Sequence, residues 1–310
     1  MEEKYVFGMK SLLSSYKMSG MKYFHNPFLK KTTCERCAKI YDPVYENCPE
    51  CGEPNPQFNP SYRSFEHTQP LGWVRELILL AFGTILLFAV AQIIGGVAVF
   101  VKTAELAGQS LSQEEIKAAL EAYLESTELS LWMNDLTYLL IFGAMLLFLW
   151  KQNRLIWKSF ANLRALYGVV FGVVILVLST IWGLIAKQLG ATPNTNESIV
   201  KDGVLSAPVL AILVTGIIAP FVEEMTYRVA GFGFLKRFNR VVAYLVIGAL
   251  FGLIHIKNYA SLNEWLSYPS YLIAGFSLCF VYERFGFGAA FIAHSINNLT
   301  VVILYLAGAN

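Results

Sequence analysis

The sequence predicts an all-α fold, a bundle of about seven membrane-spanning helices preceded by a small zinc-ribbon domain. Of its 310 residues, 55% are hydrophobic and only 15% are charged, and the mean hydropathy is +0.50. These values are too apolar for a soluble globular protein of this length. The other two observations are a run of hydrophobic segments long enough to cross a bilayer and a set of four closely spaced cysteines near the N-terminus.

Composition divides the chain into four parts. We expect an N-terminal tail over residues 1–33, a zinc ribbon over 34–55, a proline-rich linker over 56–70 and a membrane domain over 71–310. Within the membrane domain, the polar motifs described below fall in a core of about 160–308. The formal net charge of +2 is close to neutral, so bulk charge gives no reason to expect nucleic-acid binding.

Four of the five cysteines form two CxxC pairs, Cys34 with Cys37 and Cys48 with Cys51. This spacing presents four thiolates to one tetrahedral ion, so we expect a structural zinc. Two disulfides in an exported domain are the alternative. The N-terminus reaches no apolar core before Leu71, which argues against a cleaved signal peptide and favours a compartment where thiols stay reduced.

The ribbon surface is not basic, which makes phosphate-driven binding to nucleic acid an unfavourable interpretation. We expect instead either a protein partner for the ribbon or a purely structural role. The charged residues of this stretch are Arg36 and Lys39 against Glu35, Asp42, Glu46, Glu50 and Glu53.

Seven hydrophobic segments are close to the roughly 20 residues that a helix needs to cross a hydrocarbon core. They are residues 77–101, 131–150, 165–187, 206–237, 241–257, 269–283 and 287–307. The loop after the first segment is acidic, whereas the loops after the second and fourth segments are basic, and basic loops stay in the cytoplasm. We therefore expect a multi-pass protein of a bacterial plasma membrane, with the N-terminus and the ribbon in the cytoplasm.

Three polar patterns interrupt the C-terminal segments. Ionisable side chains in membrane helices are rare and face a protein interior or a water-filled cavity. At a rise of 1.5 Å per residue, Glu223 and His255 both lie about 21–22 Å from the turn that joins their two segments, and the third pattern can reach the same depth. We therefore expect one buried site, reached from the cytoplasmic side. The patterns are Glu223-Glu224-x3-Arg228, Phe251-x3-His255 and His294-x3-Asn298.

Helical spacing separates the two glutamates. Glu224 and Arg228 are an i,i+4 pair in the favourable order for an ion pair, which leaves Glu223, about 100° round the helix, free for another partner. A carboxylate and an imidazole sharing a water can remove its proton as it attacks a carbonyl, and a second histidine with a carboxamide can donate to the oxyanion. This combination fits peptide-bond hydrolysis, and neither GxSxG nor HExxH occurs.

Two other interpretations stay open. In the first, Glu223, His255 and His294 bind a catalytic zinc and leave one open position, although Asn298 would then have no obvious task. In the second, the chain is a non-catalytic membrane scaffold or immunity protein. Each motif alone would be an ordinary structural feature, but their order and common depth favour a functional site.

The three motifs, with the flanking text FGLIHIKN and FIAHSINN, resemble the CPBP intramembrane proteases. That family includes the type II CAAX prenyl endopeptidases and prokaryotic relatives linked to bacteriocin maturation and self-immunity. The resemblance covers about 160–308, the expected peptidase core, and implies an endopeptidase acting on membrane-embedded or membrane-associated peptides or proteins. Whether such substrates are prenylated stays open.

The resemblance also implies a role for each matching residue. Glu223 and His255 would activate water, and His294 and Asn298 would stabilise the oxyanion without a catalytic metal. The remaining motif residues would support them structurally, and these are Glu224, Arg228 and Phe251.

Overall fold

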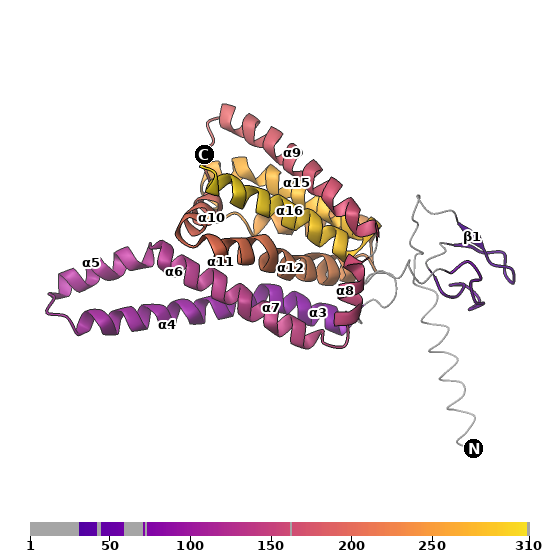
Figure 1. Cartoon of the computed structure of the whole chain (residues 1–310), viewed down its shortest axis with the longest axis horizontal. Helices are drawn as coiled ribbons and strands as arrows, with labels where there is room; N and C mark the ends of the chain where they lie inside the picture. Colours follow the sequence, from indigo (N-terminus) through magenta and orange to yellow (C-terminus); the bar gives the residue numbers. More distant parts are fainter. Residues whose placement is uncertain (1–30, 42–44, 59–70, 72, 162, 309–310) are drawn as a thin grey trace, which may run out of the picture.

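The computed structural model describes residues 31–41, 45–58, 71, 73–161 and 163–308. Most of the expected tail over 1–33 and most of the expected linker over 56–70 lie outside these residues. The described chain is mainly helical, with a small two-stranded sheet in the cysteine-rich part (Figure 1).

Five helical segments are long and apolar enough to cross a membrane, so the chain is an integral membrane protein. They are Trp73–Ala107, Thr127–Phe148, Leu163–Gln188, Pro208–Leu235 and Phe287–Leu306. These five correspond to the first four and the last of the predicted spans.

The other two segments that were predicted to cross the membrane are not among these five. The segment expected at 241–257 is a shorter helix, α14 (Arg240–Leu253), of 14 residues. At 1.5 Å per residue it is about 21 Å long, too short to cross the hydrocarbon core unaided. The segment expected at 269–283 lies within α15 (Leu262–Phe285), which begins earlier and carries Pro269 inside the helix. Five spans, rather than seven, therefore meet the length and composition of a membrane helix in the described part.

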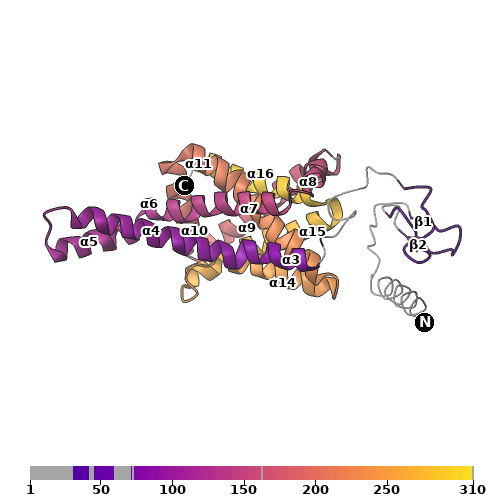
Figure 2. The ribbon, with the colours of Figure 1, turned by 90° about the horizontal axis from the view of Figure 1, so that it is seen from below.

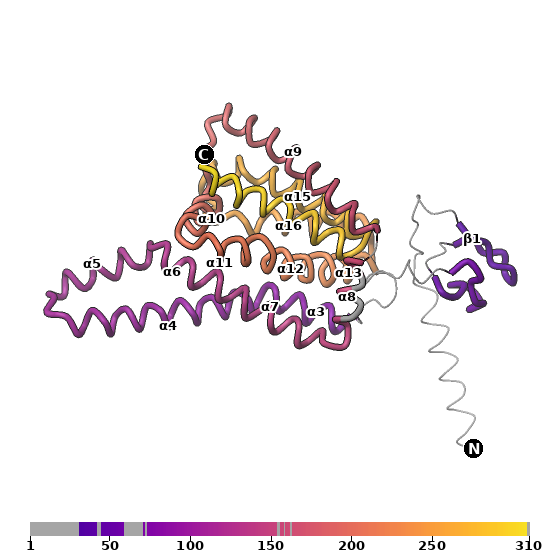
Figure 3. Tube along the Cα trace, viewed as in Figure 1, coloured from indigo at the N-terminus to yellow at the C-terminus, as the bar shows by residue number. Residues whose placement is uncertain are grey.

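The first two spans are joined by an acidic helix, α5, so that α4 and α5 form a hairpin extending beyond the other helices (Figure 3). The elements of this N-terminal half are α3 (Trp73–Ala81), the π-helical η2 (Phe82–Leu86), α4 (Leu87–Ala107), α5 (Gln113–Leu124), α6 (Thr127–Leu131), the π-helical η3 (Trp132–Leu136), α7 (Thr137–Phe148) and α8 (Asn153–Phe160). Ser112 begins α5 with a capping box, in which its hydroxyl accepts the Glu115 backbone N–H and the Glu115 carboxylate accepts that of Ser112.

The third span comprises η4 (Leu163–Leu166) and α9 (Tyr167–Gln188), and α10 (Thr195–Ser206) leads into the fourth. The last helix of the bundle is α16 (Phe287–Leu306). Asn194 caps α10 by accepting the Glu197 backbone N–H at 2.8 Å. This cap marks the start of α10, the helix between the third and fourth spans.

The fourth span departs from the regular α-helix that the sequence predicted. It consists of α11 (Pro208–Leu213), η5 (Val214–Ile218), α12 (Ala219–Glu223), η6 (Glu224–Phe232) and α13 (Gly233–Leu235), and both η5 and η6 are π-helical. Pro220 lies just after η5 and lacks a backbone N–H, so the ladder of α-helical hydrogen bonds cannot pass through it unchanged. Wide π turns occur often at functional sites, and η6 begins at Glu224.

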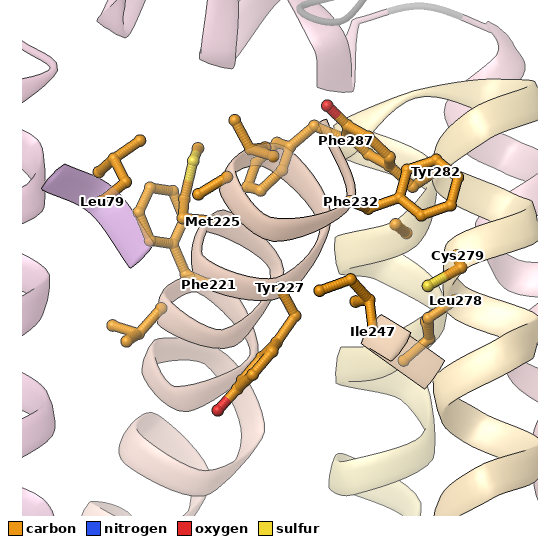
Figure 4. Packing of buried hydrophobic residues seen from close by; sticks show 14 of the residues in the cluster. Leu79, Phe221, Met225, Tyr227, Phe232, Ile247, Leu278, Cys279, Tyr282 and Phe287 are labelled. Atoms are coloured by element: carbon orange, nitrogen blue, oxygen red, sulfur yellow. The ribbon is translucent and has the colours of Figure 1, made fainter. Parts of the chain in front are cut away.

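This fourth span lies at the centre of the bundle. About 67% of its most apolar stretch is buried inside the protein, against 11–33% in the other four spans. α3 and α7 pack on one side of it, and α15 and α16 pack on the other (Figures 1 and 2). In the core around it, Leu79 of α3 lies beside Phe221 and Met225, while Phe232 faces Tyr282 of α15 (Figure 4).

The N-terminal helix approaches the central span closely. A Cβ on Gly83 would overlap the side chain of Thr226, so only glycine allows this contact without a shift. At the basic end of the central span, Arg237 donates to Glu76 of α3 at 2.6 Å, and Arg240 donates to Glu283 of α15 at 2.8 Å. The helices that precede the predicted peptidase core are therefore part of the same packed unit.

Candidate active site and metal centre

Glu223 ends α12 at the middle of the bundle and is 8% exposed. Its Oε1 accepts a hydrogen bond of 2.7 Å from the hydroxyl of Tyr138, which lies on α7. Its Oε2 is buried, and no hydrogen-bond donor within the described residues reaches it. The Nε2 atom of His294 lies 3.7 Å from this oxygen. Such a distance is too long for a direct hydrogen bond and suits one bridging water or a substrate oxygen.

Glu224 is completely buried and joins two of the three motifs. Its Oε1 lies 3.1 Å from the Arg228 guanidinium, which is also fully buried, and 2.8 Å from Nδ1 of His294. The predicted Glu224–Arg228 ion pair is thus present. Because arginine stays protonated and a carboxylate only accepts, the Nδ1 atom of His294 carries the proton in this contact.

Phe251 packs against the cation and against both histidines. The guanidinium carbon of Arg228 lies 4.1 Å from the centre of its ring, and the rings of His255 and His294 lie at 5.1 and 5.6 Å. A cation over an aromatic face is stabilised by the ring quadrupole. The ring of Phe251 therefore contacts the Arg228 cation and both imidazoles.

His255 lies in the turn after α14, and not inside a membrane helix as the sequence predicted. Its Nδ1 is 2.7 Å from the Phe251 carbonyl oxygen, which can only accept, so the proton is on Nδ1 and Nε2 has a free lone pair. The ring stacks on Tyr271 at 4.4 Å. Glu223 and His255 also lie close enough to interact electrostatically.

Asn298 lies one helical turn after His294 on α16 but turns to a different neighbour. Its Nδ2 donates to the backbone carbonyl of Thr215, in the π-helical η5, at 3.0 Å. Within the described chain no hydrogen bond joins Asn298 to Glu223 or to either histidine. The structure therefore brings Glu223, the buried ion pair, Phe251 and the histidines together, and places Asn298 at the edge of this group.

Sequence analysis missed two tyrosines that hold the site. Tyr138 is 85 residues from Glu223, outside the expected peptidase core, and nothing in its local sequence distinguishes it from other tyrosines of apolar helices. Tyr271 supports His255, and its own hydroxyl accepts from the side chains of Asn194 and Asn196 at 3.3 Å each. A signal for either would have required knowledge of which helices pack together.

A cavity of about 120 Å³ lies near the site, between α6 with η3 and α10 with α11 and η5. Thr215, which holds Asn298, forms part of its wall. The helices α6 and α10, which line this cavity, lie at the opposite end of the bundle from α13 (Figure 3).

Among the described residues, one group of side chains could bind a metal ion. It consists of the four cysteines, whose sulfur atoms lie within 4.8 Å of one another. The residues that the alternative interpretation assigns to a catalytic metal, namely Glu223, His255 and His294, do not form such a group among the described residues. Each of these histidines already uses Nδ1 for a protein contact, which leaves its Nε2 as the remaining donor atom.

The cysteine site is built from two equivalent turns. In the first, Cys34 accepts the Ala38 backbone N–H at 2.9 Å and donates its own to Lys39, and in the second Cys48 does the same with Gly52 and Glu53. Ala38 and Gly52 both have positive φ, 58° and 74°. The strands β1 (Thr32–Thr33) and β2 (Ile40–Tyr41) flank the first turn and pair antiparallel.

None of the four clustered cysteines forms a disulfide. Their sulfur atoms form a group to which a cation could bind. Burial opposes ionisation of Cys34, yet backbone hydrogen bonds from Cys37 and Arg36 outweigh it and lower its pKa to about 7. A hydrogen bond from the Lys39 backbone N–H favours the Cys37 thiolate, but burial and the neighbouring thiols raise the pKa of Cys37 to about 12. Four thiolates can coexist here only with a compensating positive charge, so the group could bind a metal ion.

A known protein family matches the part of the chain that contains the three polar motifs. Residues 205–300 match the Rce1-like family model, described as type II CAAX prenyl endopeptidase Rce1-like. All three polar motifs fall inside the match. This stretch of the chain is similar to that family. The match confirms the resemblance predicted from sequence and supports intramembrane protease activity in general, over a shorter range than 160–308.

A similar protein found by a separate comparison gives no further information on activity. An uncharacterized protein of Mycoplasma capricolum subsp. capricolum is 31% identical over 153 residues, which cover 45% of this chain and 43% of the relative. The chain thus spans less than half the length of this curated relative. No solved structure matches the chain.

Proposed function

We propose that the protein is an intramembrane endopeptidase that hydrolyses peptide bonds of membrane-associated peptides or proteins with a water activated by Glu223 and His255. The observation that carries this proposal is the buried, unpartnered Oε2 of Glu223, 3.7 Å from Nε2 of His294. An unsatisfied carboxylate oxygen in a dry interior is unfavourable unless it has a ligand to bind.

In the proposed reaction, Glu223 and His255 hold a water between Oε2 and the free Nε2 of the imidazole. The water oxygen attacks the carbonyl carbon of the scissile bond while Glu223 takes its proton. Glu223 then gives this proton to the leaving nitrogen as the C–N bond breaks. The hydroxyl of Tyr138 keeps the carboxylate in one orientation throughout.

The developing oxyanion needs donors that are already in place. Glu224 stabilises a protonated His294 ring through Nδ1, which lets Nε2–H donate toward the reacting centre. Asn298 uses one hydrogen of its carboxamide on Thr215 and keeps the second available for the oxyanion. In this scheme Arg228 is structural, because it balances the charge of Glu224.

We further propose that the four cysteines bind a structural zinc, because tetrahedral sulfur sites with this spacing favour that ion. The ribbon would then serve as a folded cytoplasmic module able to contact a protein partner. We propose no nucleic-acid partner for it.

The test compares membrane-fraction peptides from cells that carry the intact protein with those from cells that carry Glu223→Gln. We expect peptides that depend on Glu223, and purified protein whose cleavage rate falls about 10²- to 10⁴-fold with the substitution. Glu121→Gln, at an exposed position of α5, is the matched control. Cleavage that persists unchanged in the Glu223 variant would overturn the proposal in favour of a scaffold or immunity role.

A second measurement separates the metal-dependent version. The ribbon metal is first removed by Cys34→Ser together with Cys48→Ser, and the full chain is then treated with a chelator. Retained cleavage supports the water mechanism, whereas loss that added zinc restores would favour a metal bound by Glu223 and the histidines.

A further inference from the structure

The cavity beside η5 carries negative charge that the proposed chemistry does not use. Its volume of about 120 Å³ has room for roughly four water molecules at about 30 Å³ each. Glu125 and Asp202 are exposed at its rim, and Asp135 lies in its buried wall. The residues that line it include no lysine, arginine or histidine.

Asp135 is the unusual member of this set, because it is only 5% exposed. One of its oxygens accepts a hydrogen bond of 2.8 Å from the side chain of Asn134. Among the described residues, no cationic side chain forms an ion pair with it. Burying a carboxylate without a counter-charge is unfavourable, so a cation that enters the cavity would be held strongly.

Two elements that line the cavity also carry residues that contact the proposed catalytic residues. Thr215 lines the cavity and holds the Asn298 amide through its backbone carbonyl. Asp135 lies three residues before Tyr138, the residue whose hydroxyl fixes Glu223. A group bound in the cavity would therefore lie next to the elements that position the reacting residues.

We propose that this cavity is a substrate subsite that receives the lysine or arginine side chain of a peptide close to the bond to be cleaved. The proposal rests on the proposed peptidase function and adds a substrate class to it. The cationic head would form a charge-assisted hydrogen bond with Asp135, while Glu125 and Asp202 attract it at the rim. The peptide would enter from the end of the bundle at which α6 and α10 lie.

Binding can be measured without cleavage by placing a reporter thiol in the wall of the cavity. Ser130→Cys supplies it in the full chain, and mass spectrometry follows its alkylation separately from the native cysteines. The probe is acetyl-Ala-Arg-Ala-amide, and its citrulline analogue has the same shape without the charge. We expect the arginine peptide to slow labelling about tenfold, as one charge-assisted hydrogen bond would, and the analogue to have little effect.

Asp135→Asn in the same background tests the residue itself. Asparagine keeps the size and can still contact Asn134, so we expect the bundle to stay intact and the protection by the arginine peptide to disappear. If this variant is not monodisperse in detergent, Glu125→Gln with Asp202→Asn replaces it, since both side chains are exposed and their loss must weaken the protection. Equal protection by both peptides, or protection that these substitutions leave unchanged, overturns the proposal.

Cleavage profiling separates this inference from the proposed function. Peptides that depend on Glu223 should carry a basic residue near the cleavage site, and Asp135→Asn should remove this preference. Cleavage that depends on Glu223 but shows no basic preference would sink the subsite and leave the peptidase standing. Selective protection by the arginine peptide without any cleavage dependent on Glu223 would retain the cation site and refute the peptidase.

Discussion

His294 and Glu224 are joined by a contact of 2.8 Å between Nδ1 and Oε1, and this contact links the first and third polar motifs across 70 residues. It gives Glu224 a second task beside its ion pair with Arg228. One carboxylate thus holds the proton on Nδ1 of the imidazole and fixes the position of the guanidinium. The proposed chemical role of Glu223 depends on this support, because the other nitrogen of His294 faces it.

Substitution of Glu224 by Gln should destabilise the bundle strongly. Arg228 is fully buried, and the loss of its carboxylate partner would leave an uncompensated charge, which costs about 3–5 kcal/mol. Thermal unfolding of the purified protein in detergent should show a clear drop in melting temperature. The double variant Glu224→Gln with Arg228→Met should recover part of the loss, since no charge is left without a partner. A melting temperature equal to that of the intact protein in the single variant would contradict the buried pair.

Tyr138→Phe should slow cleavage without unfolding the protein. The substitution removes only the hydroxyl that donates to Glu223 at 2.7 Å, and hydrogen bonds to charged groups contribute about 1.5–3 kcal/mol. We expect kcat to fall about 10- to 100-fold, with little change in KM, because the tyrosine orients the reacting group and not the substrate.

The matched control is Tyr305→Phe, on α16 beside the small cluster around Val204. It should keep full activity. Equal rates for Tyr138→Phe and the intact protein would show that the Tyr138 hydroxyl has no part in positioning Glu223.

Elemental analysis of the purified chain should find one zinc per protein. Cys34→Ser or Cys48→Ser should remove it, because each takes away one of the four clustered sulfur ligands. Cys279→Ser should keep the metal, since that thiol is buried in α15 among the membrane helices. A preparation with intact cysteines and no bound metal, or with disulfides in their place, would refute the zinc ribbon.

Acid should loosen α5, the helix outside the membrane spans. Hydrogen bonds from the backbone N–H and the hydroxyl of Ser112, at 2.7 and 2.9 Å, lower the pKa of the Glu115 carboxyl. Its contribution is therefore present above the unfolded pKa of about 4.3 and is lost as the pH falls through the lower folded value. Hydrogen-exchange protection of α5 amides should decrease between about pH 5 and pH 3.

The control for this measurement is Glu115→Gln. Glutamine can still accept from Ser112 but does not titrate, so the protection of α5 should become independent of pH in this range. An unchanged pH response in the variant would assign the effect to other carboxyl groups.

The contacts that depend on helical spacing could be predicted from the sequence. The Glu224–Arg228 pair follows from i,i+4 spacing, and the shared depth of the motifs follows from helical rise. The position of His255 did not follow, because α14 ends at Leu253 and the side chain bonds the last turn from outside the helix. Nor did the π-helical turns, since hydropathy records how apolar a segment is and not the width of its turns.

The partners of the motif residues were the least predictable feature. Tyr138 contacts Glu223 through the packing of α7 against α12, and such packing leaves no trace in the spacing of either segment. The same holds for Thr215, whose contribution is a backbone carbonyl that any residue type would offer. The cysteine group, in contrast, could be predicted from spacing, because a CxxC turn brings its two sulfurs together locally.

The close approach of Gly83 to Thr226 sets a limit on how this molecule can be reduced in size. The family match covers residues 205–300, but Thr226 within that stretch packs closely against Gly83 of the first span. A fragment trimmed to the matched range would expose this contact surface and would separate Arg237 from Glu76, which it now bonds. The smallest fragment that keeps this packing is therefore set by contacts between helices rather than by shared sequence, and it includes the first membrane helix.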